Sequence, residues 1–406
     1  MTDSSRPIHA AVPVLGSILI GCTVVLLVLG GLTTSGRAGM ADPVWPTEPW
    51  YLIENSHVFR EPRIGFLLEH THRAAGWIVG GLAVLLALTA WIVGPNLRSR
   101  LAPMIAITAF VASYGYLHGQ MMVAQRTLNE TGVMAWPKTA IYATLGGFLA
   151  VVFTTGLHLL SRQRGSAVRG LVTLVLTGVM IQGLLGGLRV LLDKQLGLKD
   201  SLGVELSQWH GLFAQFVFCL ILLTPWVARR RTPEDALNSS DHSRLGWLGL
   251  VLVGTVFVQL LWAVWLRHNP TVLAQRLHFL TAFAVMGLIV FLTVRILTGT
   301  SSKKLLGGAA YHLLAIVGVQ IALGVEAWLG KFAAAGPEAS LAPMERTITT
   351  YVVVLRTLHQ FIGACLLGSI AVLAYRIWRK PAKSDVTNSQ PDAADVREVI
   401  SIGRFA

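Results

Sequence analysis

Four histidines stand near the starts of apolar segments that are each long enough to span a membrane. They are His72 within EHTHR, His210 within SQWHG, His278 within QRLHF and His359 within RTLHQ. Ionisable groups inside a membrane are costly and usually functional, and imidazole is a common axial ligand of haem iron. The pattern therefore predicts two histidine pairs, each able to hold one haem iron. The alternative is four histidines that are hydrogen-bonded separately within the helix packing. Zinc is less favoured, because no cysteine or carboxylate cluster accompanies each histidine.

The composition is that of a polytopic membrane protein. Of 406 residues, 53% are hydrophobic and 13% are charged, whereas soluble chains carry about a quarter charged residues. A net charge of +13 would suggest nucleic acid in a soluble protein, but membrane topology explains it here, so we expect membrane lipid and no nucleic acid as a partner. Spanning helices need about 20 apolar residues. The sequence predicts ten, over residues 12–33, 70–94, 101–124, 138–161, 168–191, 207–229, 245–267, 275–298, 307–330 and 351–378.

Basic residues gather in every second predicted loop and after the last helix. They are Arg98, Arg100, Arg162, Arg164, Arg169, Arg229, Arg230, Arg231, Arg244, Arg295, Lys303, Lys304, Arg376, Arg379, Lys380 and Lys383. Because Lys and Arg prefer cytoplasmic loops, we expect a multi-pass protein of the inner (plasma) membrane with both termini in the cytoplasm. All four histidine-bearing helices then run inward, which places the four histidines at a similar shallow depth near the outer face.

The chain also repeats itself. Glu69 and His72 have the spacing of Gln275 and His278, and Gln182 and Gly186 have that of Gln320 and Gly324. The expected fold is all-α: a polytopic membrane helix bundle of two parallel four-helix repeats plus an inserted helical hairpin. The predicted parts are an N-terminal half over 1–229 with the hairpin at 101–162, a C-terminal half over 245–380, and a disordered tail over 381–406.

The repeat is broken at one place. Glu69 shares a helix face with His72 and can reach Arg73, but the second half has the neutral Gln275 in place of the carboxylate. This difference predicts proton-linked chemistry in the first half and electron transfer in the second. The alternative for Glu69 is a structural ion pair with Arg73.

Taken together, these residues resemble the haem A synthase family, polytopic enzymes of cytochrome oxidase assembly. The resemblance is carried by Glu69, His72 and Arg73 in a Glu-x-x-His-Arg motif, and by the other three histidines at equivalent helix starts once the hairpin is set aside. The VLGGLT run at 28–33 and the loop with Trp45-Pro46 also resemble the family's first helix and first outer loop. The likeness covers most of residues 12–378.

The resemblance implies an oxidoreductase that oxidises a methyl group of haem O to the formyl group of haem A, using a bound haem b. It implies that His278 and His359 ligate the haem b iron and that His72 and His210 face the iron of the substrate haem. Glu69 and Arg73 would be catalytic, and Arg276 would bind a propionate of the cofactor. The expected partners are haem O, haem O synthase and an electron donor.

Two other classes of function remain open on the sequence. A haem b electron-transfer subunit that takes electrons from quinol would need the histidines but not Glu69. A transporter would suit parallel repeats, although no pair of Gly- or Pro-broken helices marks the middle of the membrane. Gln182, Gln259 and Gln320 would either hydrogen-bond the imidazoles or join helices to one another.

Overall fold

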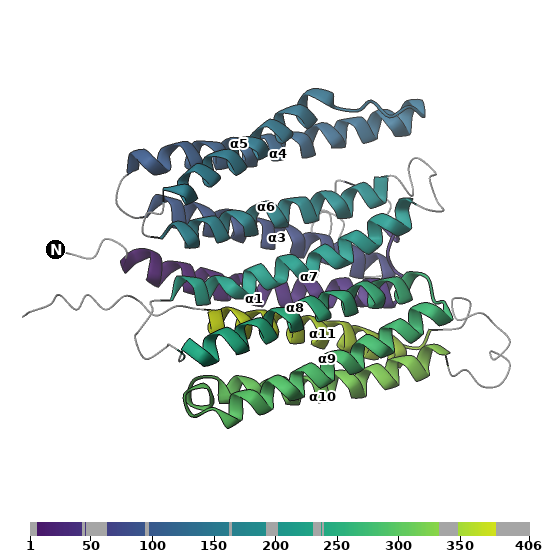
Figure 1. Ribbon diagram of the computed structural model, residues 1–406. Helices are drawn as coiled ribbons and strands as arrows, with labels where there is room; N and C mark the ends of the chain where they lie inside the picture. Colours follow the sequence, from purple (N-terminus) through teal and green to yellow (C-terminus); the bar gives the residue numbers. More distant parts are fainter. Residues whose placement is uncertain are drawn as a thin grey trace, which may run out of the picture.

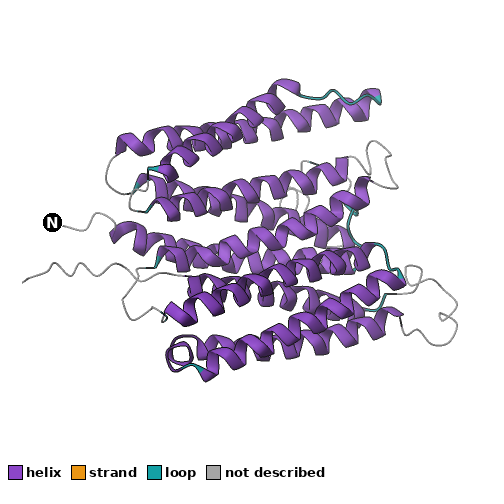
Figure 2. Ribbon diagram, in the orientation of Figure 1, coloured by secondary structure: helices purple, strands orange, loops and turns teal. Residues whose placement is uncertain are grey.

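In the part of the chain that the computed structural model describes, the protein is built from α-helices alone (Figure 2). That part is residues 6–42, 45, 63–93, 97–161, 165–191, 202–229, 237, 239–332 and 348–378. The helices are α1 (Arg6–Ser35), α3 (Ile64–Ile92), α4 (Leu97–Thr131), α5 (Lys138–Leu160), α6 (Ser166–Val190), α7 (Leu202–Ala228), α8 (Ser239–His268), α9 (Val272–Thr298), α10 (Thr300–Phe332) and α11 (Thr350–Trp378). All ten are long and apolar enough to cross a membrane, and helices suit lipid because they satisfy their own backbone hydrogen bonds.

Eight of the helices form two four-helix rings with the same order of contacts. In the first ring α1 packs on α3, α3 on α6, α6 on α7, and α7 back on α1. In the second ring α8 packs on α9, α9 on α10, α10 on α11, and α11 back on α8. Each ring has its own apolar core, and the rings meet where α11 contacts α1 and α7 and where α7 contacts α8.

The inserted hairpin lies outside the first ring (Figure 1). Its two helices, α4 and α5, pack on each other, and α4 also contacts α3 while α5 contacts α6. A small cluster joins the hairpin to the ring near the ends of α4 and α6, and Trp45 lies in it with Leu117, Met121 and Val190. The hairpin is therefore an addition to one half that has no counterpart in the other.

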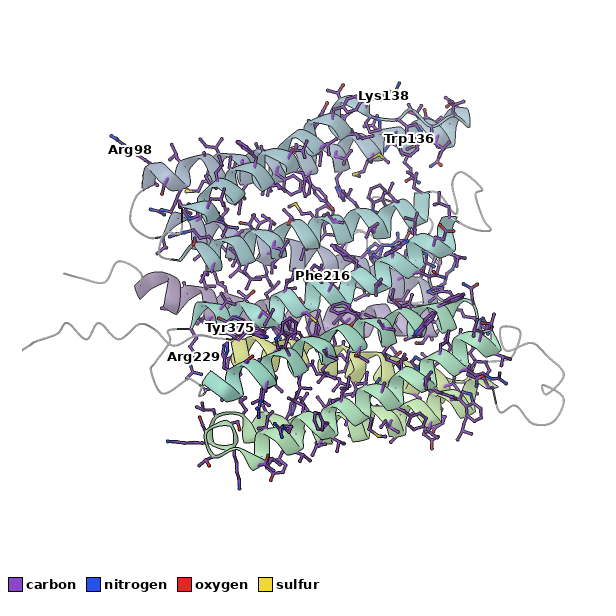
Figure 3. All side chains as sticks on the ribbon, in the orientation of Figure 1. Arg98, Trp136, Lys138, Phe216, Arg229 and Tyr375 are labelled. Atoms are coloured by element: carbon purple, nitrogen blue, oxygen red, sulfur yellow. The ribbon has the colours of Figure 1, made fainter. Side chains whose placement is uncertain are left out.

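Charged side chains differ between the two ends of the bundle. Figure 3 shows Arg98 and Arg229 at one end, which we call the basic end, and Lys138 at the other. The carboxylates with described side chains all lie in the half of the bundle away from the basic end, and they are Asp42, Glu69, Glu130, Glu205 and Glu326. We call that opposite end the histidine end, because the four histidines also lie toward it.

At the basic end, two arginines close the C-terminus of α3. Arg100 donates to the carbonyls of Trp91 and Ile92 at 2.5 and 2.6 Å, and Arg169 donates to those of Ala90 and Val93 at 3.1 and 2.9 Å. The last carbonyls of a helix have no partner within it and carry partial negative charge, so cations are favourable there. Both arginines are buried, and they fasten α4 and α6 to the end of α3.

The predicted helices are confirmed, but most extend beyond their predicted ends. The prediction started α3 at residue 70, whereas it begins at Ile64, and the predicted loop at 299–306 is almost entirely the start of α10. Sequence reasoning found the apolar part of each helix and missed the polar turns that continue it. As a result Glu69 lies inside α3 and not at its edge. The predicted disordered tail lies outside the described residues.

Candidate functional site

The four predicted histidines come from four helices that all start at the histidine end. They are His72 on α3, His210 on α7, His278 on α9 and His359 on α11, each within about three turns of the helix start. The start of α9 is fixed by Thr271, whose side chain accepts a hydrogen bond from the amide of Ala274 at 3.2 Å. The two four-helix rings therefore each bring a pair of histidines to the same level.

The second-half histidines face each other at a distance that fits one metal ion between them. The ring centroids of His278 and His359 are 6.4 Å apart, with an angle of 77° between the ring planes. Metal–imidazole nitrogen bonds are about 2.0–2.1 Å long, so two imidazoles on opposite sides of one ion have centroids about 6.3 Å apart. The centroid distance therefore matches two ligands of one ion, and it also matches an edge-to-face contact between two rings. In the first half, His72 and His210 are close enough for their charges to interact, and Arg189 interacts with both.

Each histidine is held at the same ring nitrogen, Nδ1, by the neighbouring helix. His72 Nδ1 lies 3.1 Å from the carbonyl oxygen of Leu26, and His359 Nδ1 lies 3.2 Å from that of Gln320. Because a carbonyl only accepts, Nδ1 carries the proton in both rings and Nε2 keeps a lone pair. A ligand histidine whose other nitrogen donates to a carbonyl is the usual arrangement at metal sites.

The other two histidines contact glutamines of the neighbouring helices. Gln182 Nε2 lies 2.9 Å from His210 Nδ1 and donates to the His210 carbonyl at 2.8 Å. The backbone carbonyl of Gln182 also hydrogen-bonds to His210, as that of Gln320 does to His359, so the amide alone does not assign the proton of His210 to one ring nitrogen.

Gln259 Nε2 lies 3.0 Å from His278 Nδ1 and 3.5 Å from His278 Nε2. Its Oε1 meets Thr281 Oγ1, whose one proton is also directed at the Leu277 carbonyl. Turning the Gln259 amide lets Oε1 accept from His278 and Nε2 donate to Thr281. The imidazoles of His278 and His359 can thus both present an Nε2 lone pair, as that of His72 does in the first half.

Glycines on the neighbouring helices make room for three of the four imidazole rings. A Cβ at Gly30 would lie 2.8 Å from His72 Cε1, one at Gly186 would lie 3.0 Å from His210 Cε1, and one at Gly324 would lie 2.9 Å from His359 Cε1. The repeated Gln-x-x-x-Gly spacing therefore forms a socket, in which α6 or α10 supplies a hydrogen-bond group and, one turn later, a space for the ring.

A buried ionic cluster lies beside the first pair. Arg73 donates to Glu69 Oε1 at 2.6 Å and to the Asp42 carbonyl at 2.7 Å, and its Nη1 lies 3.3 Å from Asp42 Oδ2. Glu69 Oε2 accepts from the Asp42 amide at 2.8 Å, and His70 Nδ1 lies 3.1 Å from Asp42 Oδ2. Glu69 therefore does form an ion pair with Arg73, which was the alternative to a catalytic role. Sequence reasoning missed Asp42 and the role of His70, because only folding brings the end of α1 to α3.

The arginine that lies beside His278 and His359 is not the one that the sequence suggested. Arg276, two residues before His278, is exposed. Arg267 on α8 instead reaches into the protein, where it donates to Gln360 Oε1 and, at 2.7 Å, to Ser35 Oγ on α1. Gln360 follows His359 directly, so Arg267 lies beside the second pair. Sequence reasoning did not single out Arg267, which lies two residues before Asn269 near the end of α8.

The inserted hairpin contributes aromatic packing next to the first half. His118 on α4 lies between the rings of Trp45, Trp77 and Tyr114, with centroid distances of 5.4, 5.1 and 4.7 Å. The Trp45 amide donates to Gln125 Oε1 at 3.2 Å. Trp45 also packs on Gly187, the residue after the socket glycine of His210. His118 is thus a packed side chain of the hairpin, which covers the first half through Trp45.

The arrangement defines a polytopic helical membrane protein with two pairs of histidines at one end. Within the described residues, no group of three or more His, Cys, Asp or Glu side chains is arranged to hold a metal ion. Comparisons of the chain with protein-family models, with curated proteins and with solved structures gave no match.

Proposed function

We propose that this chain is a haem-binding membrane oxidoreductase of the haem A synthase type. His278 and His359 would ligate haem b, and the first half would bind haem O and oxidise one of its methyl groups. The observation that carries the proposal is the 6.4 Å separation of the His278 and His359 rings. The sockets on α10 and α6 give independent support, because they orient imidazoles as ligand sites do.

The chain's own residues would divide the work between the halves. A bound haem b supplies one-electron chemistry, and two fixed imidazoles suit that role because the ligand set stays the same in both oxidation states. In the first half, His72 would present its Nε2 lone pair to the substrate haem, and His210 would face the same ligand. Glu69 would exchange a proton or offset positive charge beside the reacting methyl group, and Arg73 would hold Glu69 in place.

A haem b electron-transfer subunit is the second candidate, and a specific observation favours it. Both carboxylate oxygens of Glu69 are engaged, one by Arg73 and the other by the Asp42 amide. A carboxylate held in this way also serves a purely structural purpose. On this alternative, Glu69 fastens the end of α1 to α3, and the chain performs no chemistry on haem.

The first experiment is a reduced-minus-oxidised spectrum of the purified protein. We expect a low-spin b-type haem, which His278→Ala and His359→Ala each abolish or make high-spin. His118→Ala is the control, because His118 packs in the hairpin away from the second pair. Absence of haem, or spectra unchanged in both pair variants, would remove the second-half site.

The second experiment separates the two candidates by their products. The protein is supplied with haem O, oxygen and a reducing partner, and the extracted haems are separated by chromatography. Haem A in the extract supports the synthase. A low-spin haem b spectrum with no haem A supports electron transfer alone.

The charge difference between the ends supports an orientation in the inner (plasma) membrane with the basic end in the cytoplasm. On that orientation both termini are cytoplasmic, because α1 begins and α11 ends at the basic end. Reporter fusions in the segments 230–238 and 333–347 should then report opposite sides of the membrane. A report of the same side for both would contradict the shared depth of the histidines.

A further inference from the structure

The inward face of α3 leaves open space next to the first histidine pair. Gly76 follows His72 by four residues, about one helical turn, and Gly80 lies one turn further along. Val79 and Ala83 stand on the same face, and their exposed fractions of 2% and 0% show that it points into the first ring. A Cβ built at Gly76 or at Gly80 would meet nothing within 4 Å in the described part of the chain. We call these two open positions the α3 space.

The glycines of the α3 space differ from the glycines that bring helices together. A Cβ at Gly178 on α6 would lie 3.0 Å from Val217 Cγ2 on α7, so the absence of a side chain at Gly178 allows that close approach. Gly76 and Gly80 allow no such approach, because no neighbouring group fills the position of the missing side chain. Protein interiors are close-packed, and atoms that line an unfilled space lose their contacts. The α3 space therefore suits an apolar group that the chain itself does not supply.

The internal repeat shows which residues of α9 correspond to those of α3. Aligning His72 with His278 places Val79 on Val285. Both valines are buried, with exposed fractions of 2% and 4%. The two helices therefore present the same register to their own rings, and the two halves can be compared position by position.

In this register the second half fills what the first half leaves open. Gly76 corresponds to Ala282, and Gly80 corresponds to Met286. The Met286 side chain packs against the apolar core of the second ring. The largest difference between the two inward faces next to the histidines is therefore a methionine side chain in the second half and open space in the first.

The socket glutamines give a separate sign that each half takes a ligand. The side-chain oxygens of Gln182 and Gln320 are both buried, and neither has a hydrogen-bond partner. A buried acceptor without a partner is costly, and this cost falls when a ligand, or a water held by a ligand, donates to it. The acceptor is common to both halves, so it indicates that both are occupied, whereas the α3 space indicates that their occupants differ in shape.

We propose that the α3 space binds a long apolar chain of the porphyrin held by the first half, and that Met286 excludes such a chain from the second half. The proposal rests on the proposed function, under which the first-half ligand is haem O. Haem O carries an isoprenoid chain where haem b carries a vinyl group. An apolar space stays dry and takes apolar ligands. Gly80 and Met286 are then the residues that direct each haem to its own half.

The test loads protein that was produced without haem with equal amounts of haem O and haem b. Chromatography of the extracted haems gives the ratio that each variant retains. Gly80→Met puts the second-half residue into the α3 space. One methylene more or less in an apolar pocket changes discrimination by about 10- to 200-fold, so we expect the ratio of haem O to haem b to fall at least about tenfold.

Gly81→Met is the matched control for this variant. Gly81 is the next residue, but it is exposed, and a Cβ there also meets nothing within 4 Å in the described part of the chain. Its equivalent in the second half is again a glycine, Gly287. Gly81→Met should retain the wild-type ratio. An unchanged ratio in Gly80→Met, or an equal fall in both variants, would overturn the α3 space as the site of the chain.

The reverse change tests the second half and does not depend on how well Gly80→Met folds. Met286→Gly is made together with His72→Ala and His210→Ala, so that the second pair alone holds haem. Opening the position of Met286 should raise the affinity of this pair for haem O at least about tenfold relative to haem b. No gain would overturn the exclusion by Met286.

The wild-type result separates this proposal from the proposed function. Retention of haem O by the wild type and, equally, by Gly80→Met would overturn the α3 space and leave the proposed function in place. Retention of haem b with no haem O by the wild type would instead overturn the proposed function, on which the α3 space depends.

Discussion

The two halves have the same helix order and the same sockets, yet they place charge in different ways. In the first half Arg73 is paired with Asp42 and Glu69 and lies with His70 in a buried ionic cluster. In the second half Arg267 donates to Gln360 and to Ser35, and the described residues there include no buried carboxylate. One half thus carries buried carboxylates beside its histidines, and the described part of the other does not.

The sockets are shared between the halves. The rings of His278 and His359 lie at the distance expected for two ligands of one ion. In the first half, Gln182 contacts His210 through its side-chain amide and its backbone carbonyl, and in the second half the Gln320 carbonyl contacts His359. The halves therefore differ in the buried carboxylates beside their histidines more than in the sockets that hold the imidazoles.

The largest expected effect is that of Glu69→Gln on turnover. The amide keeps the size of the side chain, and its one oxygen can still accept from Arg73, but its nitrogen then faces the Asp42 amide and it cannot exchange a proton. General acid–base groups typically contribute about 100- to 10,000-fold in rate, so haem A formation should fall within that range while the haem b spectrum persists. The product is measured by chromatography of extracted haems.

The matched control is Gln275→Ala, at the equivalent position of the second half. This variant should leave the rate of haem A formation within about threefold of the wild-type rate, a change smaller than the loss of a general acid–base group causes. Full haem A yield from Glu69→Gln would leave Glu69 with its structural role alone, and the halves would then differ less than we infer.

A smaller effect is expected from the socket glycine of the second half. In Gly324→Ala the new Cβ would lie 2.9 Å from His359 Cε1, so the ring must move from its position opposite His278. Outer-shell changes at metal sites typically cost about 10- to 100-fold in affinity, and we expect a loss of haem b affinity of that size. Gly318→Ala on the same helix is the control, because a Cβ there meets nothing within 4 Å. Unchanged haem b affinity in Gly324→Ala would show that the socket does not set the position of the His359 imidazole.

The smallest effect concerns stability at the basic end of the first half. Trp91 Nε1 donates to Thr173 Oγ1 at 2.9 Å between α3 and α6, and Trp91 is fully buried. Trp91→Phe removes this bond and should lower the free energy of unfolding by about 1–3 kcal/mol, since the Thr173 hydroxyl is left buried without that partner. Thermal unfolding in detergent measures the change, and the haem b spectrum should stay the same. Loss of the haem b spectrum in this variant would mean that the second four-helix ring depends on the first for its stability.

Much of this fold is predictable from sequence, because lipid imposes simple rules on apolar length and on repeated motifs. The ten helices, the repeat of Gln182 with Gly186 and of Gln320 with Gly324, and the level of the four histidines all follow from spacing. The cationic and acidic neighbours do not. Asp42 reaches α3 through a tertiary contact, and Arg267 faces inward although it stands beside a helix end. Arg276 is close to His278 in sequence, but two residues along a helix turn a side chain to the opposite face.

The most direct test of the difference between the halves is electron paramagnetic resonance of two double variants loaded with ferric haem b. His72→Ala with His210→Ala leaves the second-half pair, and His278→Ala with His359→Ala leaves the first-half pair. We predict a low-spin signal from the former, since His278 and His359 would both ligate the iron, and loss of that low-spin signal from the latter. A low-spin signal from the first-half pair, or a high-spin signal from the second-half pair, would contradict the account.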